Sequence, residues 1–586
     1  MSHLNAPSRR KPGRLLAALV ISAGLIGVAC GSDDTSSKTT DATSPASETT
    51  GPGTEETTPG AVETTAAPPT TAAGEVPVPG GKVVMGIEAD TSSPWRPSEM
   101  VCAIACYQVI RNIYDSLAMA NDAGSWSPYL ASAITPNDDY TVWSITAREG
   151  VTFHDGTPFD GAAIVENISR AKAGILTGNA LRPVETVEVD AADPMTAVVT
   201  MNTSWAAFPF TLAGQAGMQA SPTWLAASDT DDTLKSQPVG TGPFVYADYR
   251  PGEVFSMTKN PDYWNAPYPY LDAIEFRPIV DGLNRRDALK SGTVDIIHTT
   301  NAESIVEFRD NPDEYPMVEI TNNAETGYTL LHVTQEGSPL TDVRVRCALA
   351  YATDEQLLID TIGAGIAQIA FGPFSPTQVG YLESTGFPEA QDMAKAQELI
   401  AEYKAEFPGP LSLSLATTTD QTNLTIAQQQ QQWWTEAGID EVTIDQIDQA
   451  NYIVTALLGN FQVFQWRQHG GFDLDQQYIW WHSKAAPPVG ELALNFGRIR
   501  DPQLDALLDE NRASTDPARK KEIAEEVNRL FGTQCYDIWG SYSIWGIASK
   551  PSVHGLSLIP LPDGTNAPFG AGISGTFYPM TLWVEQ

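Results

Sequence analysis

The chain has 586 residues, of which 72 are acidic and 34 are basic, and its formal net charge is −38. A surface this acidic repels nucleic acid and anionic lipid headgroups, which excludes binding to either by electrostatic attraction. The length exceeds what one ordinary hydrophobic core supports, so we expect two or three lobes.

Residues 1–30 have the pattern of an export signal. A basic start is followed by an apolar run from Leu15 to Ala29, which is shorter than the roughly 20 residues of a permanent membrane helix. Cys30 follows Gly27-Val28-Ala29 and resembles the cysteine of a bacterial lipobox, although Gly27 replaces the usual Leu. We expect lipidation at Cys30; the alternative is a secreted protein in which this cysteine is incidental.

Residues 31–79 are rich in Thr, Ser, Pro, Gly, Ala and acidic side chains and almost lack large apolar ones. Such a composition cannot offset the entropy lost on ordering. We expect a disordered tether, which as a flexible coil would reach on the order of 40 Å.

The first folded elements are predicted as a buried strand at 82–89 and a helix over 102–117. A second strand at 140–149 alternates, with Trp143, Ile145 and Ala147 on one face. It leads through an Asp155-Gly156 turn to a helix that Asp160 opens.

The middle of the chain mixes strands and helices. Two alternating runs within 184–201 flank Asp193-Pro194 and predict a hairpin. The stretch 272–297 has a strand-helix-strand pattern, which is typical of a parallel α/β element. Later helices are predicted to begin at Asp342, Asp354 and Asp516, and strands are expected at 441–447 and 461–467.

Four cysteines remain after Cys30, namely Cys102, Cys106, Cys347 and Cys535. Outside the cytoplasm they can form up to two disulfides, and the sequence leaves all three pairings open. Cys102 and Cys106 lie in the predicted helix, where a bridge between them would need a distorted backbone. No second close pair of Cys or His accompanies them, which argues against zinc.

Catalytic signatures are scarce, since the chain has no G-x-S-x-G, H-E-x-x-H or P-loop motif. His469, Asp473, Asp475 and His482 are close in sequence, but their spacing fits no standard metal motif, so we favour structural polar roles. Glycoside hydrolases use a pair of carboxylates, but among 72 acidic residues such pairs are inevitable and give no evidence for that activity. We expect neither an enzyme nor a cofactor or metal.

The 14 Trp and 19 Tyr residues suit either a hydrophobic core or a cleft that closes on a ligand. Trp466, Arg467 and His469 are the better ligand-binding candidates. They lie at the end of a predicted strand that leads into the Gly470-Gly471 loop, where cleft residues of α/β lobes gather.

Several motifs together resemble one protein family. In chain order they are WSPYLA at 126–131, GVTFHDGTPF at 150–159, PVGTGPF at 238–244, KNPDYW at 259–264, GTVD at 292–295, DVRVRCALAYATD at 342–354, FGPFSP at 371–376 and the segment 501–531. Over nearly all of residues 80–586 the chain resembles the peptide/nickel class of extracellular solute-binding proteins of ABC importers.

The resemblance implies an α/β fold with two lobes and an additional domain, the periplasmic-binding-protein or Venus-flytrap architecture. Lobe I would be discontinuous, formed by 80–108, 235–318 and 548–586. A small domain would fill 109–234, and lobe II would cover 319–547. A ligand would be enclosed between lobes that close by hinge motion.

Peptide binders of this family commonly hold the ligand's amino group with an Asp after the strand that here ends at Trp466. This chain has Arg467, Gln468 and His469 there, with Asp473 as the nearest acid. The departure favours a ligand with an acceptor, carboxylate or phosphate group, because Arg donates to such groups. Tyr107 and Asn495 complete the candidate ligand-binding residues.

The expected function is that of a lipid-anchored, non-enzymatic, monomeric binding protein on the outer face of the cell membrane. It would capture a small, peptide-like solute and deliver it to an ABC permease. One alternative is a relative without transport activity that serves envelope assembly or regulation. A weaker alternative is an extracellular hydrolase.

Overall fold

The computed structural model describes residues 76–90, 94–174, 176–321, 325–468, 471, 473–570 and 574–585. These residues belong to a compact unit that spans 66–586. The expected export signal, Cys30 and the tether up to residue 75 lie outside the described residues. Within the described ranges, none of the helices combines the length and the apolar character that crossing a bilayer requires.

A seven-stranded sheet draws its strands from three separated parts of the chain. Its order is β12-β18-β11-β1-β10-β9-β8. β1 lies between β10 and β11 and runs parallel to both, which confirms the parallel element predicted at 272–297. The bounds are β1 Lys82–Ile87, β8 Phe244–Arg250, β9 Val254–Lys259, β10 Ala273–Pro278, α6 Gly282–Lys290, β11 Ile296–Thr299, β12 Met317–Ile320 and β18 Trp545–Ser549.

A five-stranded sheet is built from the later half of the chain, in the order β15-β14-β16-β13-β17. Its strands are β13 Thr326–Leu331, β14 Ser412–Thr418, β15 Glu441–Ile447, β16 Val463–Gln468 and β17 Asp537–Tyr542. The chain therefore passes from one large sheet to the other twice, between Ile320 and Thr326 and between Tyr542 and Trp545.

A four-stranded antiparallel sheet, ordered β4-β5-β7-β6, forms a third unit together with α2. The predicted alternation is confirmed, because Trp143, Ile145 and Ala147 of β5 are all buried. Asp160 caps α2 by accepting a hydrogen bond from the amide of Ala163 at 2.9 Å. The bounds are β4 Ala131–Pro136, β5 Val142–Ala147, α2 Gly161–Ala173, β6 Val184–Val189 and β7 Thr196–Met201.

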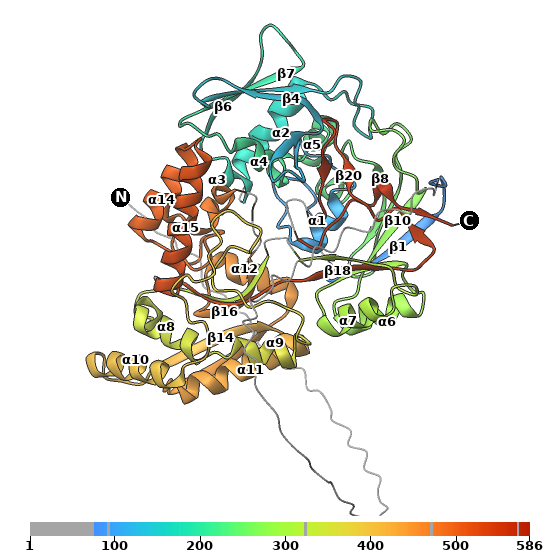
Figure 1. Ribbon diagram of the computed structural model, residues 1–586. Helices are drawn as coiled ribbons and strands as arrows, with labels where there is room; N and C mark the ends of the chain where they lie inside the picture. Colours follow the sequence, from blue (N-terminus) through green and yellow to red (C-terminus); the bar gives the residue numbers. More distant parts are fainter. Residues whose placement is uncertain are drawn as a thin grey trace, which may run out of the picture. The chain divides into compact units, whose positions relative to one another are not determined.

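Each sheet has a hydrophobic core of its own. We call the part built on the seven-stranded sheet lobe I, the part on the five-stranded sheet lobe II, and the part on the four-stranded sheet the small domain. Figure 1 shows α6 and α7 beside β18 in lobe I, and α8, α10 and α11 around β14 in lobe II. This is the two-lobed α/β architecture with an additional domain that the sequence predicts.

The remaining elements are mostly helices of lobe II and short pairs of strands. The helices are α3 Thr177–Ala180, α4 Phe208–Leu212, α5 Pro222–Ser228, α7 Ala302–Asp310, α8 Val343–Ala352, α9 Glu355–Thr361, α10 Met393–Glu406, α11 Gln421–Glu436, α12 Gln449–Leu458, α13 Tyr478–Trp481, α14 Pro502–Ala513 and α15 Pro517–Gln534. The short strand pairs are β2 Ala118–Ala120 with β3 Trp126–Pro128, β19 Val553–His554 with β22 Trp583–Val584, and β20 Ile559–Pro560 with β21 Asn566–Ala567.

The predicted helix over 102–117 is wrong at both ends, because α1 covers only Ile104–Ile110. Cys102 lies before the helix, where the backbone is free to bend, and it forms a disulfide with Cys106. The second disulfide joins Cys347 of α8 to Cys535 at the end of α15. The structure thus selects one of the three pairings.

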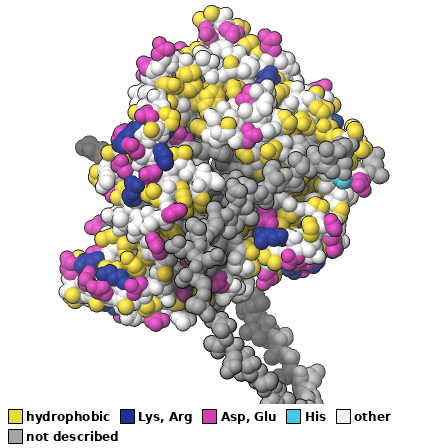
Figure 2. All heavy atoms as spheres, in the orientation of Figure 1, with side chains coloured by type: hydrophobic (Ala, Val, Ile, Leu, Met, Phe, Trp, Pro, Cys, Tyr) yellow, Lys and Arg dark blue, Asp and Glu magenta, His cyan; other side chains and the backbone are white. Residues whose placement is uncertain are grey.

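On the face shown in Figure 2, Asp and Glu side chains are dispersed among apolar and neutral ones, with Lys and Arg between them. No single acidic patch dominates the described part of that face.

Candidate ligand-binding site

A cavity of about 240 Å³ lies where lobe I, the small domain and lobe II meet. Its walls come from segments far apart in the sequence, which is the arrangement expected of a site between lobes. The residues that the argument below uses are Tyr107, Arg111, Asp115 and Tyr578 from the lobe I side, Trp205 and Phe210 from the small domain, and Leu457, Trp466, Asp475, Trp480, Phe496 and Arg512 from lobe II.

The lobe II wall of the cavity is aromatic. Trp466, near the end of β16, packs edge-on against Phe496 with ring centroids 5.0 Å apart. Trp480 meets the same Phe496 ring at 5.3 Å, also edge-on. The three rings form a continuous apolar surface, as binding pockets for partly apolar ligands usually have.

On the lobe I side, α1 carries Tyr107 and ends at Arg111. The Tyr107 hydroxyl donates to the side-chain oxygen of Gln215 at 3.1 Å. Burial raises the pKa of Tyr107 well above its ordinary value, so the hydroxyl stays protonated. The Arg111 guanidinium lies over the ring of Tyr578, 4.3 Å from its centre, which places a positive charge beside the cavity.

Asp115 is a buried carboxylate held by three neutral donors. The Tyr263 hydroxyl donates to its Oδ1 at 3.1 Å, and Trp264 and Thr241 donate to its Oδ2 at 2.9 and 3.0 Å. Burial raises the pKa of Asp115 to about 6, although these hydrogen bonds and the charge of Arg148 oppose the shift.

Asp475 connects the small domain to lobe II. Its Oδ1 accepts from Nε of Arg512 at 2.6 Å, and its Oδ2 accepts from the indole N–H of Trp205 at 2.6 Å. The Arg512 guanidinium also lies 3.6 Å from the centre of the Tyr478 ring. Asp475, Arg512 and Trp205 are all buried, and the opposite charges of Asp475 and Arg512 compensate each other within the cluster.

Arg467 does not line the cavity in the structure. Its guanidinium lies 3.3 Å from the carboxylate of Glu88 and 3.6 Å from that of Glu325. Burial alone would raise the pKa of Glu88, but the nearby guanidinium groups, above all that of Arg467, outweigh it and hold this pKa below its ordinary value. The side chain predicted to meet a ligand is therefore engaged by two carboxylates of the protein.

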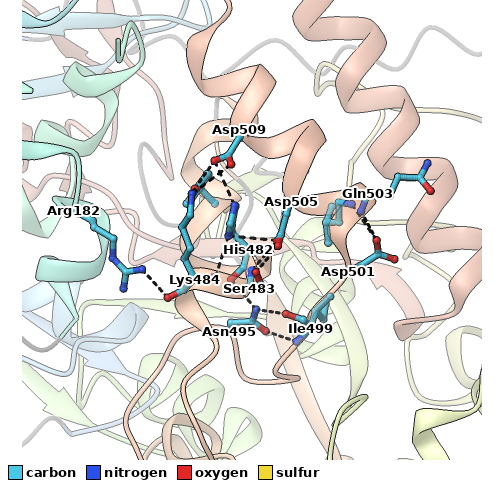
Figure 3. Close-up of polar contacts among 12 residues, drawn as sticks. Arg182, His482, Ser483, Lys484, Asn495, Ile499, Asp501, Gln503, Asp505 and Asp509 are labelled. Carbon is cyan, nitrogen blue, oxygen red and sulfur yellow. Dashed lines mark hydrogen bonds and ion pairs between the residues drawn. The ribbon is translucent and has the colours of Figure 1, made fainter. Parts of the chain in front are cut away.

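Two other predicted residues have structural contacts. Asp473 caps the turn of helix that starts at Leu474 and forms an ion pair with Lys520. Asn495 is fully buried; its amide donates to the carbonyls of His482 and Ile499 at 3.2 and 3.1 Å (Figure 3). Neither belongs to the cavity lining, and His469 lies outside the described residues.

His482 is held by the helix that packs against it. Its two ring nitrogens lie 3.3 Å from Asp505 and 3.4 Å from Asp509, one turn apart on α14 (Figure 3). Arg182 of the small domain donates to the carbonyl of the nearby Lys484 at 2.6 Å. Among the described residues, no group of three or more His, Cys, Asp or Glu side chains is arranged to hold a metal ion.

Of the sequence candidates, Tyr107 and Trp466 line the cavity. Sequence reasoning missed Arg111, Trp205 and Arg512. The available signal for Arg111 was a charged side chain within the apolar segment 102–117. Trp205 and Arg512 gave no local signal, because their shared partner Asp475 is 270 and 37 residues away in the sequence.

Comparison with known proteins gives consistent matches. A family model described as "Bacterial extracellular solute-binding proteins, family 5 Middle" matches residues 125–488. The glutathione-binding protein GsiB of Salmonella paratyphi A is 29% identical over 355 residues, which cover 59% of this chain and 66% of that protein. GsiB of Pectobacterium atrosepticum is 30% identical over 306 residues, covering 51% and 58%. These alignments span less than two thirds of the relatives' length.

Solved structures share the fold. The periplasmic binding protein DppA of Helicobacter pylori, in complex with peptide STSA, superposes with a TM-score of 0.75 at 21% identity, covering 87% of this chain and 99% of that one. The binding protein AgaA of A. tumefaciens R10, in complex with agropinic acid, also has a TM-score of 0.75, at 24% identity and with coverage of 86% and 99%.

Proposed function

Because the chain belongs to family 5 of the bacterial extracellular solute-binding proteins, we propose that it captures a small, peptide-like solute outside the cytoplasm and delivers it to an ABC permease. The observation that carries the proposal is the cavity, whose walls come from both lobes and the small domain. A ligand in such a site is enclosed when the lobes close and is released when they open.

The peptide-like character of the solute is supported by what the similar proteins bind. GsiB is named for glutathione, and the DppA structure holds a peptide. The cavity supports a ligand with an apolar part, because Trp466, Trp480 and Phe496 form one wall. Burial of a ligand's apolar surface against these rings contributes about 25 cal/mol per Å².

The membrane tether of the protein is proposed from the sequence. Cleavage before Cys30 and acylation of that cysteine would hold the chain at the outer face of the membrane, with residues 31–79 as the linker. The division into lobe I at 80–108, 235–318 and 548–586, the small domain at 109–234 and lobe II at 319–547 remains a proposal. It differs in detail from the lobes named above by their sheets, because its bounds cut β12 and β18 and place Arg111 and Asp115 in the small domain.

Native mass spectrometry of the protein purified from its own host tests the proposal. We expect a co-purified small molecule as an added mass, which is lost when a cavity wall is altered by Trp466→Ala. Binding without chemical change of the ligand separates a carrier from a hydrolase. A protein that binds no small molecule but retains a stable envelope partner would replace this proposal with a role in assembly.

A further inference from the structure

The two carboxylates that line the cavity are already hydrogen-bonded on all four of their oxygens. Asp115 accepts from Tyr263 on Oδ1 and from Trp264 and Thr241 on Oδ2. The oxygens of Asp475 accept from Arg512 and Trp205, as described above. Oδ2 of Asp115 accepts two hydrogen bonds and is filled, whereas the other three oxygens accept one each, so a ligand ammonium would have to share them with a donor that the protein already supplies.

The negative charges of these carboxylates are also compensated by the protein. Arg512 pairs directly with Asp475. Arg148, whose guanidinium lies 4.6 Å from the centre of the Trp264 ring, is close enough to favour the ionised form of Asp115. The described residues of the cavity wall therefore offer little uncompensated negative charge that could attract a cationic group of a ligand.

Arg111 contributes the opposite charge. It is nearly buried, and the ring of Tyr578 backs its guanidinium at 4.3 Å. The ring attracts the cation and limits its movement, and the edge of a guanidinium matches the two oxygens of a carboxylate. In a cavity of low polarity, a charge of this kind favours an anionic group strongly.

We propose that the solute is a compact anion with an apolar, preferably aromatic, body and no free ammonium group, and that its anionic end lies beside Arg111. This inference rests on the proposed function. The cavity of about 240 Å³ is smaller than the roughly 300–1,000 Å³ of sites for drug-sized ligands, which fits a ligand the size of a blocked amino acid or a short peptide.

Calorimetric titration with three probes of similar size tests the ligand class. The probes are 3-phenylpropanoate, an anion; phenylalanine, a zwitterion; and 3-phenylpropylamine, a cation. We expect the anion to bind at least about tenfold more tightly than the amine, because one charge-assisted hydrogen bond is worth about 1.5–3 kcal/mol. Equal or tighter binding of the amine, or binding of none of the probes, would overturn the proposal.

Variants at position 111 assign the preference to this side chain. Arg111→Met keeps the length and the apolar stem and should abolish the preference for the anion, whereas Arg111→Lys should keep part of it. An unchanged preference in Arg111→Met overturns the placement. Should native mass spectrometry find a co-purified ligand that carries an ammonium and no anionic group, the ligand class fails while the role as a solute carrier stands.

Discussion

The guanidinium of Arg467 lies 3.3 Å from the carboxylate of Glu88, and this ion pair joins lobe II to lobe I. Arg467 belongs to β16 of the five-stranded sheet, and Glu88 follows β1 of the seven-stranded sheet. Glu325 lies in one of the two segments that connect the sheets, and it accepts a hydrogen bond from the indole of Trp545 in the other sheet at 3.1 Å. The ion pair thus lies beside the two segments that connect the sheets, and it links the two lobes there.

Glu88→Gln should shift the protein toward an open arrangement. The variant keeps the size of the side chain but removes its charge, while Arg467 retains Glu325. For a partly exposed pair we expect about a two- to fivefold change in the ratio of closed to open molecules. Small-angle X-ray scattering should show a larger radius of gyration for the ligand-free variant.

The matched control is Glu275→Gln. Glu275 forms an ion pair with Lys82 at 2.8 Å, and both residues belong to lobe I. Loss of that charge should leave the scattering unchanged. If both variants scatter like the unaltered protein, the Glu88 pair does not influence closure.

Trp205→Phe should weaken the contact between the small domain and lobe II. The substitution removes the only described donor to Oδ2 of Asp475 and leaves this buried oxygen without a partner. We expect a loss of about 1–3 kcal/mol in the free energy of unfolding beyond the effect of the smaller ring. Urea denaturation measures this loss.

Trp143→Phe is the corresponding control within the same domain. Trp143 is as deeply buried as Trp205, but its indole nitrogen has no hydrogen-bond partner among the described residues. The two substitutions remove the same atoms, so the difference between them isolates the hydrogen bond. Equal losses for both variants would contradict the assigned role of the Trp205 indole.

Asp537 should make the protein less stable as the pH rises. Burial at the start of β17 raises its pKa to about 8 from an ordinary value of 3.8, against the opposing effects of a backbone hydrogen bond and Arg346. The folded state therefore binds this proton more tightly than the unfolded state does. The stability that this proton contributes is fully present below pH 4. It is lost as the pH rises toward 8, by up to about 1.4 kcal/mol per pH unit.

Asp537→Asn tests this pH dependence, because the amide stays neutral throughout. Denaturation at pH 5 and pH 8 should show that the variant gains stability relative to the unaltered protein as the pH rises. Asp138→Asn, at an exposed turn, should show no such gain. A difference that is constant with pH would mean that Asp537 does not carry the proton.

The two disulfides should differ in what they stabilise. Cys347 and Cys535 are separated by 188 residues, and Cys102 and Cys106 by four. A bridge that closes a longer loop removes more entropy from the unfolded chain, so replacing the first pair by Ser should cost about 2–4 kcal/mol and the second pair less. Thermal unfolding of the two double variants checks the order.

The short bridge should matter more for the ligand site, because both Cys102 and Tyr107 line the cavity. Its double Ser variant is expected to bind ligand more weakly while unfolding at nearly the same temperature. Equal binding by both double variants would argue that the segment before α1 holds its shape without the bridge.

Short sequence patterns correctly predicted the elements that depend on contacts between neighbouring residues. The alternation in β5 and the capping aspartates at 160, 342, 354 and 516 were each correct, because a neighbouring amide completes the interaction. The helix over 102–117 was overestimated because the chain beyond Arg111 is held by distant partners; Asp115 binds Tyr263, Trp264 and Thr241. Tertiary contacts override helix propensity there.

Two of the residues predicted for the site, Tyr107 on α1 and Trp466 on β16, line the cavity. Trp466 was placed by its position near the end of β16, and it lines the cavity. Arg467, its neighbour, has its side chain directed by Glu88 and Glu325, which are 379 and 142 residues away in the sequence. A single sequence contains no pattern that predicts ion pairs between residues so far apart.

The tryptophans that line the cavity should make the intrinsic fluorescence of the protein sensitive to the state of the cavity. Trp205, Trp466 and Trp480 all line it, one from the small domain and two from lobe II. Indole emission depends on the polarity around the ring, so entry of a solute or separation of the lobes should change the fluorescence spectrum without any added dye. Ligands can therefore be screened on the unlabelled protein, with Trp205→Phe separating the signal of domain movement from that of the aromatic wall.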